Sequence, residues 1–281
     1  DAVFLFRMTL WLSPNYPNAR YNLGGCYVRM GKMAEGKAAL MKALAQDPNN
    51  LDIRFMLASA DPSALSASQR PTTMPMSIVT GFFTSSADGY DLAEAANKYQ
   101  AGKVMHDLLK PHVKETAPVI LDLGCGSGIA ARPWRSTASS IHGVDVTPAM
   151  AALANEATHE QKKLFDVVTV ADARTLPAEF AAGTADAVLV VNMAQFVGDL
   201  APIMKTAHAA LKAGGVVAIT TEPMKLTAGF GLLQETSRFG HTAMYVKQTA
   251  NEAGLTLVHE SPLQLYSGIP VAAYVFSKGS K

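Results

Sequence analysis

The sequence predicts an α/β fold, with a mostly parallel seven-stranded sheet that ends in an antiparallel hairpin, preceded by a small all-α segment. Two observations predict it. From Pro118 onward, short Val/Ile/Leu runs alternate with amphipathic segments, as is typical of parallel strands with helices on both faces. Before that point, Pro14 and Pro48 mark a repeat of 34 residues, which is typical of stacked helix pairs.

The composition excludes several classes of protein. The 281 residues are 49% hydrophobic and 17% charged, with net charge +1, so the basic excess of nucleic-acid binders is missing. Cys26 and Cys125 have neither disulfide-framework nor zinc-site spacing. The apolar residues 2–12 are interrupted by Arg7 and are about half the length of a membrane span. We therefore expect no nucleic acid, no membrane, no metal and a cytoplasmic location.

Composition also divides the chain into four expected segments. Residues 1–60 carry the helical repeat, and residues 61–75 are rich in Ser, Pro and Thr, as linkers are. Residues 76–116 read as a helical cap or substrate lid, and residues 117–281 hold the sheet.

The repeat places apolar residues on one face of each of two helices, namely Leu23, Gly24 and Tyr27 on the first and Leu40 and Ala43 on the second. This pattern resembles the tetratricopeptide repeat (TPR), of which about one and a half copies are present. Arg20 stands where that family favours an aromatic residue and Gly36 stands where it favours Ala, so looser packing is expected. The segment either packs on its neighbour or offers a groove to a partner protein.

Seven strands are expected, at residues 119–124, 139–145, 165–172, 185–192, 214–222, 255–260 and 271–277. One helix should begin after Thr147 as its cap, with Pro148 in its first position, and another should stop at Gly254. The last two strands are joined by residues 261–270, a connection too short for a crossover helix, so they should be antiparallel.

The first strand runs through Asp122 into the glycines of a GxGxG turn, Gly124, Gly126 and Gly128. Such a turn lets the backbone approach a ligand closely, and two ligands are open: a dinucleotide and S-adenosylmethionine. Dinucleotide folds favour GxGxxG without an acid on the strand. A carboxylate suits a ligand with an ammonium group and would repel a pyrophosphate.

These residues resemble motif I of the class I S-adenosylmethionine-dependent methyltransferases, which implies a Rossmann-like sheet and S-adenosylhomocysteine as the product. Asp145, at the end of the second strand, would accept the ribose hydroxyls of either ligand. The resemblance implies that Asp172 and Ala173 hold the adenine. The full set of expected cofactor residues is Asp122, Gly124, Cys125, Gly126, Gly128, Asp145, Val146, Asp172, Ala173, Asn192 and Met193.

The resemblance extends to a group of predicted methyltransferases that carry tetratricopeptide repeats ahead of the catalytic domain. It is carried by "GDL" at residues 198–200, by "FGHTAMYV" at residues 239–246 and, loosely, by residues 77–91. In the last of these, Thr84 stands where the group has an acid.

Methyl transfer is a direct displacement, so the enzyme mainly aligns the acceptor and excludes water. His241 is the best candidate for a general base, with Tyr245 one helical turn further on to orient it. The alternative is a helix-start histidine that faces solvent or bonds Tyr245. Phe83, Tyr90, Tyr99 and Phe196 are expected to bind the substrate, or else to lie in the core.

The acceptor is expected to be a small molecule with an O, N or C nucleophile. Asn192 is followed by Met-Ala-Gln rather than by the Pro-Pro-aromatic run of methylases that act on planar amino groups. Two alternatives remain, a protein acceptor recruited through the TPR segment and a non-catalytic S-adenosylmethionine-binding scaffold. The oligomeric state is left open.

Overall fold

The computed structural model describes residues 2–97, 99–178, 180–225, 229–266 and 269–280, which form two compact units. The helical unit comprises the described residues of Asp1–Ile78 together with Gly231–Phe239. The sheet unit comprises those of Val79–Phe230 and Gly240–Lys281. None of the helices in these ranges has the length and apolar character needed to cross a membrane.

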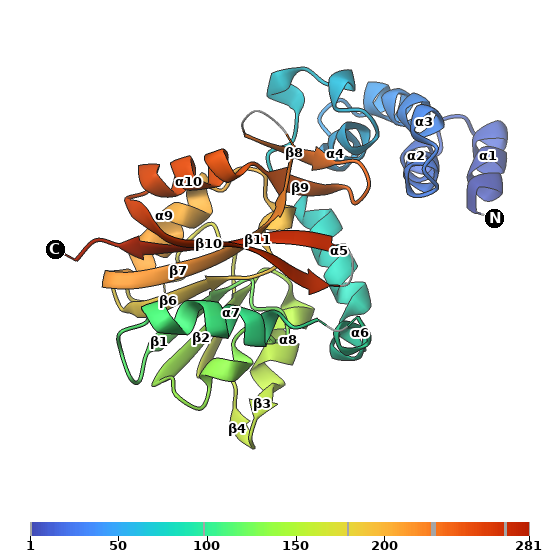
Figure 1. The fold of residues 1–281 in the computed structure, drawn as a ribbon. Coiled ribbons are helices and arrows are strands. Elements are labelled where there is room, and N and C mark those ends of the chain that lie inside the picture. Colours follow the sequence, from blue (N-terminus) through green and yellow to red (C-terminus); the bar gives the residue numbers. More distant parts are fainter. Residues whose placement is uncertain (1, 98, 179, 226–228, 267–268, 281) are drawn as a thin grey trace. The chain divides into compact units, whose positions relative to one another are not determined.

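The helical unit is built from α1 (Ala2–Leu12), α2 (Ala19–Arg29), α3 (Met33–Gln46) and α4 (Leu51–Ala60) (Figure 1). Helices α2 and α3 pack closely, because a Cβ built on Gly24 would lie 2.5 Å from Leu40 Cγ. The looser packing expected at Gly36 is wrong. A Cβ there would lie 2.9 Å from Val28 Cγ2, so the missing side chain is what lets the helices approach.

Short helices follow: η1 (Pro62–Ala64), η2 (Ala67–Gln69), α5 (Met76–Ser86), α6 (Tyr90–Ala96), α7 (Ala101–Leu109) and η3 (Lys110–His112). Leu65 is buried in the core of the helical unit. Helices α5 and α6 contain no buried residue, whereas α7 buries Met105 and Leu109 against the sheet. Of these helices, α7 therefore makes the buried packing contacts with the sheet.

The main sheet confirms the predicted fold. Its strands are β1 (Val119–Leu123), β2 (Ser140–Asp145), β5 (Val167–Val170), β6 (Ala185–Val190), β7 (Leu211–Pro223), β10 (Leu255–Tyr266) and β11 (Ile269–Lys278). They follow the order β10-β11-β7-β6-β1-β2-β5, in which β11 is antiparallel to both of its neighbours and the other pairs are parallel. Parallel neighbours bring their carboxyl ends to one edge.

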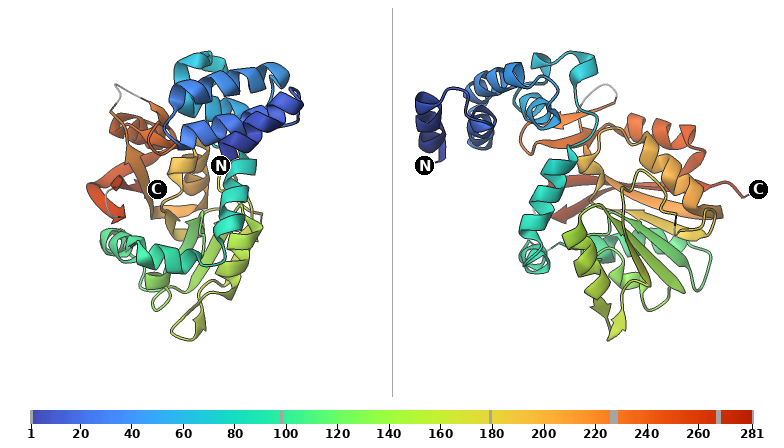
Figure 2. Two further views of the ribbon diagram at one scale, coloured as in Figure 1. Left: turned by 90° about the vertical axis from the view of Figure 1, so that its right-hand side faces the viewer. Right: turned by 180° about the vertical axis from the view of Figure 1, so that it is seen from behind.

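Helices cover both faces of the sheet (Figure 2). Ile120 faces one core layer with α7 and Trp134, which ends η4 (Arg132–Trp134). Leu121 faces the other, with α9 (Ala201–Ala210) and α10 (Ala243–Glu252). Because both faces are covered, the strands read as continuous apolar runs.

The predicted helix starts and stops are largely confirmed. Helix α8 (Pro148–Glu156) begins at Pro148 with Thr147 in the N-cap position, although the Thr147 side chain makes no capping hydrogen bond. Helix α10 is capped by Thr242, whose hydroxyl accepts from Tyr245 N–H at 3.2 Å. Gly254 lies just beyond its end at φ 83°, in the left-handed region that favours glycine.

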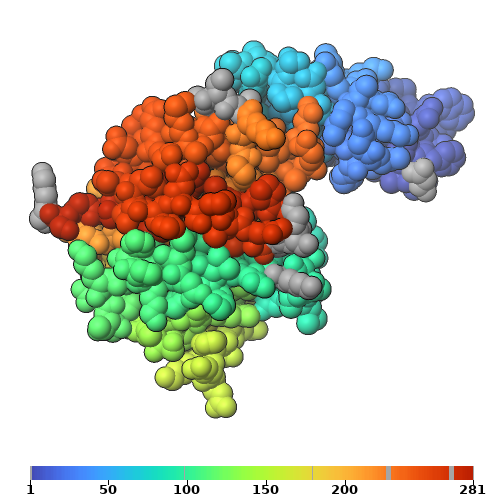
Figure 3. Space-filling model, viewed as in Figure 1, coloured from blue at the N-terminus to red at the C-terminus, as the bar shows by residue number. Residues whose placement is uncertain are grey.

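The C-terminal hairpin is antiparallel, as predicted, but the expected ten-residue connection is wrong. Strand β10 continues to Tyr266 and β11 begins at Ile269, so most of residues 261–270 lies in the two strands. Residues 267 and 268 are outside the described residues. Figure 3 shows the hairpin beside α7, with which Leu265 and Val271 share a core layer.

Two small hairpins were not predicted. One is β3 (Thr158–His159) with β4 (Lys162–Lys163). The other is β8 (Phe230–Leu233) with β9 (Arg238–His241), and the far end of β9 pairs in parallel with the end of β7.

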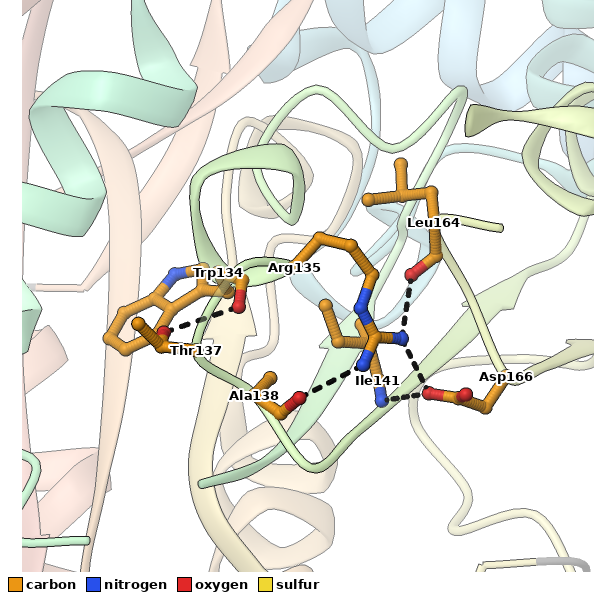
Figure 4. A network of polar contacts seen from close by, with 7 residues as sticks. All are labelled: Trp134, Arg135, Thr137, Ala138, Ile141, Leu164 and Asp166. Atoms are coloured by element: carbon orange, nitrogen blue, oxygen red, sulfur yellow. Dashed lines mark hydrogen bonds and ion pairs between the residues drawn. The ribbon is translucent and has the colours of Figure 1, made fainter. Parts of the chain in front are cut away.

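Arg135, which follows η4, binds the segment just before β5 and, through Asp166, the start of β2 (Figure 4). Its guanidinium donates to Asp166 Oδ2 at 2.7 Å and to the carbonyl oxygens of Leu164 and Ala138, and the same carboxylate accepts from Ile141 N–H at 2.8 Å. Burial raises the pKa of Asp166, but the hydrogen bonds and charge of these partners outweigh it, so the pKa is lowered. The network is structural.

Two helical glycines should respond to alanine in opposite directions. A Cβ on Gly102 in α7 would lie 2.3 Å from the Ile129 carbonyl oxygen, so we expect Gly102→Ala to reduce the free energy of unfolding by about 1–3 kcal/mol. A Cβ on Gly81 in α5 would meet no atom of another part of the chain within 4 Å, so Gly81→Ala should raise the free energy of unfolding by up to about 1 kcal/mol. Denaturant unfolding at neutral pH measures both. Shifts in the same direction would contradict the packing described.

Candidate active site

Half-buried residues gather where β1, β2, β5 and β6 end at the same edge of the sheet. They are Gly124, Gly126, Asp145, Val146, Asp172, Ala173, Asn192 and Met193. Direct contacts join these ends, since Gly126 N–H donates to Asp145 Oδ2 at 3.0 Å and Ala171 N–H to the Asp145 carbonyl at 3.1 Å. The structure thus brings the expected cofactor residues together at one edge.

The three glycines of the turn do different things. Gly124 and Gly128 have positive φ, and a Cβ on either would strike a neighbour, Met193 Cγ at 2.6 Å or Leu164 Cδ2 at 2.4 Å. Gly126 also has positive φ, 54°, but the nearest atom to its Cβ position is Met150 Cε at 3.6 Å. Gly124 and Gly128 therefore serve packing, and only Gly126 leaves space for a ligand.

Asp122 is a buried carboxyl with an unused oxygen. The residue is 1% exposed, and its Oδ2 has no hydrogen-bond partner among the described residues. Burial, and next the charge of Asp145, raise its pKa to about 8. An unpaired buried carboxylate is unstable, whereas a ligand ammonium would supply the missing partner.

Asp145 holds the glycine turn. Its Oδ2 accepts from Gly126 N–H, and its Oδ1 accepts from Thr147 N–H at 2.8 Å. Burial raises its pKa, and these hydrogen bonds act in the opposite direction. The lone pairs that remain can accept hydroxyl groups.

Asp172 is already engaged within the chain. Its carboxylate accepts from the backbone N–H of Arg174 at 2.9 Å and from Arg174 Nε at 3.0 Å to both oxygens. The side-chain hydrogen bond from Arg174 is the largest cause of its lowered pKa. Both side chains are about one-third exposed, so the pair lies at the rim of the site.

The Cys125 thiol is part of the core. It is 5% exposed, and a Cβ on Gly143 would lie 2.9 Å from its Sγ. Burial, followed by the charges of Asp122 and Asp145, raises its pKa well above the usual value. Thiolate chemistry is excluded in this state, and any cofactor contact must come from the backbone.

His241 ends strand β9 and is not the exposed helix-start residue that one reading of the sequence allowed. It is 1% exposed, and its Nε2 lies 2.9 Å from the carbonyl oxygen of Val197 and 3.1 Å from that of Gly198. Since carbonyls only accept, Nε2 carries the proton. Burial lowers the pKa of His241 to about 4, against the effect of these two hydrogen bonds.

Tyr245 stacks on His241, with ring centroids 6.0 Å apart, and contacts the same segment of the chain, residues 197–200. Its hydroxyl oxygen accepts from Leu200 N–H at 3.0 Å and lies 3.2 Å from Asp199 Oδ1. Burial is the main cause of its raised pKa. We call His241 and Tyr245 the clamp and residues 197–200 the clamped segment.

Sequence reasoning missed this pairing. The "GDL" and "FGHTAMYV" motifs lie far apart in the sequence, and the clamp joins them in the structure. Sequence reasoning also missed Gln195, a 3% exposed side chain that donates to Asn192 O at 2.7 Å and to Asn192 Oδ1 at 2.8 Å. Asn192 has φ 54°, unusual for a residue other than glycine, so these bonds fix a strained turn after β6.

Three of the four expected substrate aromatics lie together. The ring of Phe83 in α5 lies 5.4 Å from that of Phe196 and 6.2 Å from that of Tyr90. Tyr99 instead packs against the core layer that contains Met105. Among the described residues, no three His, Cys, Asp or Glu side chains gather as metal ligands would.

Comparison with known families gives two matches. Residues 121–219 match a family described as a methyltransferase domain, and residues 1–60 match the tetratricopeptide repeat. Among proteins with curated functions, none matches the chain significantly.

Three similar solved structures share the fold. The [4+2]-cyclase SpnF has a TM-score of 0.61 and 16% identity, covering 75% of this chain and 98% of its own. Magnesium protoporphyrin IX methyltransferase from Synechocystis PCC 6803 with bound SAH has a TM-score of 0.57 and 12% identity, covering 73% of this chain and 100% of its own. The 1,6-didemethyltoxoflavin-N1-methyltransferase from Burkholderia thailandensis, solved with bound 1,6-didemethyltoxoflavin and S-adenosylhomocysteine, has a TM-score of 0.54 and 18% identity, covering 72% of this chain and 88% of its own.

Proposed function

We propose that this chain, an S-adenosylmethionine-dependent methyltransferase with a tetratricopeptide segment ahead of its catalytic domain, transfers the methyl group to a small-molecule acceptor. The cofactor assignment is carried by the buried Asp122 carboxyl, whose Oδ2 has no hydrogen-bond partner among the described residues, together with the open Cβ position of Gly126. S-adenosylmethionine combines an ammonium, two ribose hydroxyls and an adenine, and the site has a group suited to each. When bound, it supplies a sulfonium methyl whose leaving group departs neutral.

The residues at the sheet edge divide the recognition between them. Asp122 would pair with the ammonium, and Gly126 admits the ligand close to the backbone. Asp145 would accept the ribose hydroxyls while it holds the turn. Asp172 would accept the adenine amino group beside its bond to Arg174, and the half-buried Val146, Ala173, Asn192 and Met193 would line the same space.

The acceptor side is formed by the aromatic cluster of Phe83, Tyr90 and Phe196. Such rings favour a flat, partly apolar molecule and exclude water from the displacement. Two of the similar solved proteins are named as methyltransferases of 1,6-didemethyltoxoflavin and of magnesium protoporphyrin IX, both of them ring compounds, which supports this class of acceptor.

His241 and Tyr245 fit a positioning role better than the general-base role expected from sequence. The bonded nitrogen of His241 holds a backbone carbonyl, and its other nitrogen is buried. We propose that transfer relies on alignment, with an acceptor that is already nucleophilic, such as a neutral amine or a thiolate.

Two observations keep other functions in view. The tetratricopeptide match favours a protein partner or acceptor. The similarity to a [4+2]-cyclase means that this fold also supports chemistry other than methyl transfer.

The acceptor class is tested by incubating the full chain with methyl-labelled S-adenosylmethionine and a cell extract, then separating proteins, nucleic acids and small molecules. We expect label in the small-molecule fraction. Label in protein would favour recruitment through the TPR segment. Cofactor binding without label anywhere would favour a scaffold.

The cofactor map is tested by Asp145→Ala and Asp172→Ala. Each removes a charged hydrogen-bond acceptor, so we expect the affinity for S-adenosylhomocysteine in calorimetric titration to fall about tenfold or more. Asp107→Ala is the control, since Asp107 is exposed and pairs with its α7 neighbours Lys103 and His106. Wild-type affinity in both site variants would show that the map is wrong.

A further inference from the structure

Strand β9 runs from one compact unit into the other. Arg238 and Phe239 belong to the helical unit, and Gly240 and His241 belong to the sheet unit. The hairpin is inserted between β7 and α10, in the part of the chain that carries the clamp.

The first half of the strand is part of the helical core. Phe239 is 1% exposed, and its ring centroid lies 6.2 Å from that of Phe55 in α4, which is also 1% exposed. Leu232 of β8 packs against the same core as Leu57. The helical unit therefore includes most of a hairpin that the chain inserts between β7 and α10 of the sheet unit.

The second half of the strand ends at the clamp. Gly240 and His241 pair with Glu222 and Pro223 of β7, which fixes the strand to the sheet. His241 then donates to the carbonyl oxygens of Val197 and Gly198.

The clamped segment leads directly to the acceptor wall. Phe196 precedes Val197 and ends η5 (Ala194–Phe196), and its ring contacts Phe83. A shift of the Val197 carbonyl would therefore move Phe196, while the glycine turn and Asp145 lie on other strands.

We infer that Phe239 is a positioning residue for the acceptor wall, and that it holds Phe196 in place through β9, His241 and the clamped segment. The inference rests on the proposed function, because it assigns the wall to the acceptor. It gives the tetratricopeptide segment a role inside the enzyme: Phe55 and its neighbours anchor the strand that sets the acceptor side of the site.

The test compares backbone amide hydrogen exchange over residues 193–200 in full-length variants. Phe239→Leu and Phe55→Leu loosen the anchor and should raise exchange there about tenfold or more. His241→Ala should do the same, and His241→Gln should restore part of the protection because its amide can donate to the same carbonyls. Leu40→Val is the matched control, since Leu40 is buried between α2 and α3.

The control variant should keep wild-type exchange over residues 193–200, and Phe239→Leu, Phe55→Leu and Leu40→Val should bind S-adenosylhomocysteine within about twofold of wild type. With an acceptor identified by labelling, KM for it should rise in Phe239→Leu while cofactor affinity stays. Unchanged exchange at 193–200 in Phe239→Leu, or an equal increase in Leu40→Val, would overturn the inference. A wild-type protein that fails to bind S-adenosylhomocysteine would instead refute the proposed function and leave the exchange comparison valid.

Discussion

Asp122→Asn should make the ligand-free protein more stable in mild alkali. In the folded state the pKa of Asp122 is raised to about 8 from its ordinary 3.8, so between about pH 4 and pH 8 the folded protein holds a proton that the unfolded chain has lost. Stability from this group is present below pH 4 and is lost as pH rises through 8. Asparagine cannot ionise and avoids that loss, which amounts to about 1.4 kcal/mol per pH unit within the window.

Thermal unfolding at pH 6 and pH 8.5 measures this effect. The difference in Tm between Asp122→Asn and wild type should grow at the higher pH. Asp166→Asn is the control. The lowered pKa of Asp166 means that its carboxylate stabilises the folded state equally at every pH above its ordinary pKa, so Asp166→Asn should lower Tm by the same amount at pH 6 and at pH 8.5. A Tm difference for Asp122→Asn that does not change with pH would contradict the burial of a lone carboxyl.

The same carboxyl should link cofactor binding to pH. An ammonium favours the ionised form, so wild-type affinity for S-adenosylhomocysteine should rise between pH 6 and pH 8, by at most about tenfold per unit. Asp122→Asn should bind more weakly and lose this dependence. Calorimetric titration across the range checks both, and equal affinity in the two proteins at pH 8 would remove Asp122 from the site.

Gly126→Ala should weaken cofactor binding strongly while leaving the fold intact. Its Cβ meets no protein atom closer than 3.6 Å, so the methyl group would occupy the space assigned to the ligand. The positive φ adds a backbone cost of about 1–2 kcal/mol. We expect the affinity for S-adenosylhomocysteine to fall at least about tenfold.

Gly183→Ala is the matched control, because Gly183 has φ 70° and no atom within 4 Å of its Cβ position. Both variants should lose similar stability in thermal unfolding, and only Gly126→Ala should lose affinity. Equal affinity in the two would mean that the ligand does not pass over Gly126.

The central sheet is predictable because its strands are covered on both faces and read as continuous apolar runs. The hairpin at the sheet edge is less so. Pro262 suggests a break in the strand, yet it lies within β10 and pairs with Ala272 of β11. Strand β10 is at the edge of the sheet, where a proline is tolerated. Strands β8 and β9 have only four residues each, too few for a clear periodic signal.

The site divides in the same way. Asp122, Gly126 and Asp145 follow from a local motif and from strand ends, which sequence spacing reports directly. The burial of His241 depends on β9 and on the Val197 carbonyl 44 positions away, which no local pattern contains. The bond between Asp172 and Arg174 depends on a side-chain conformation that the residue types leave open.

The most direct measurement is a crystal structure of the full chain grown with S-adenosylhomocysteine. The account predicts the ligand over Gly126, with its ammonium about 3 Å from the Asp122 carboxylate and its ribose hydroxyls at Asp145. A ligand bound elsewhere on the sheet unit, with Asp122 still unpartnered, would contradict it.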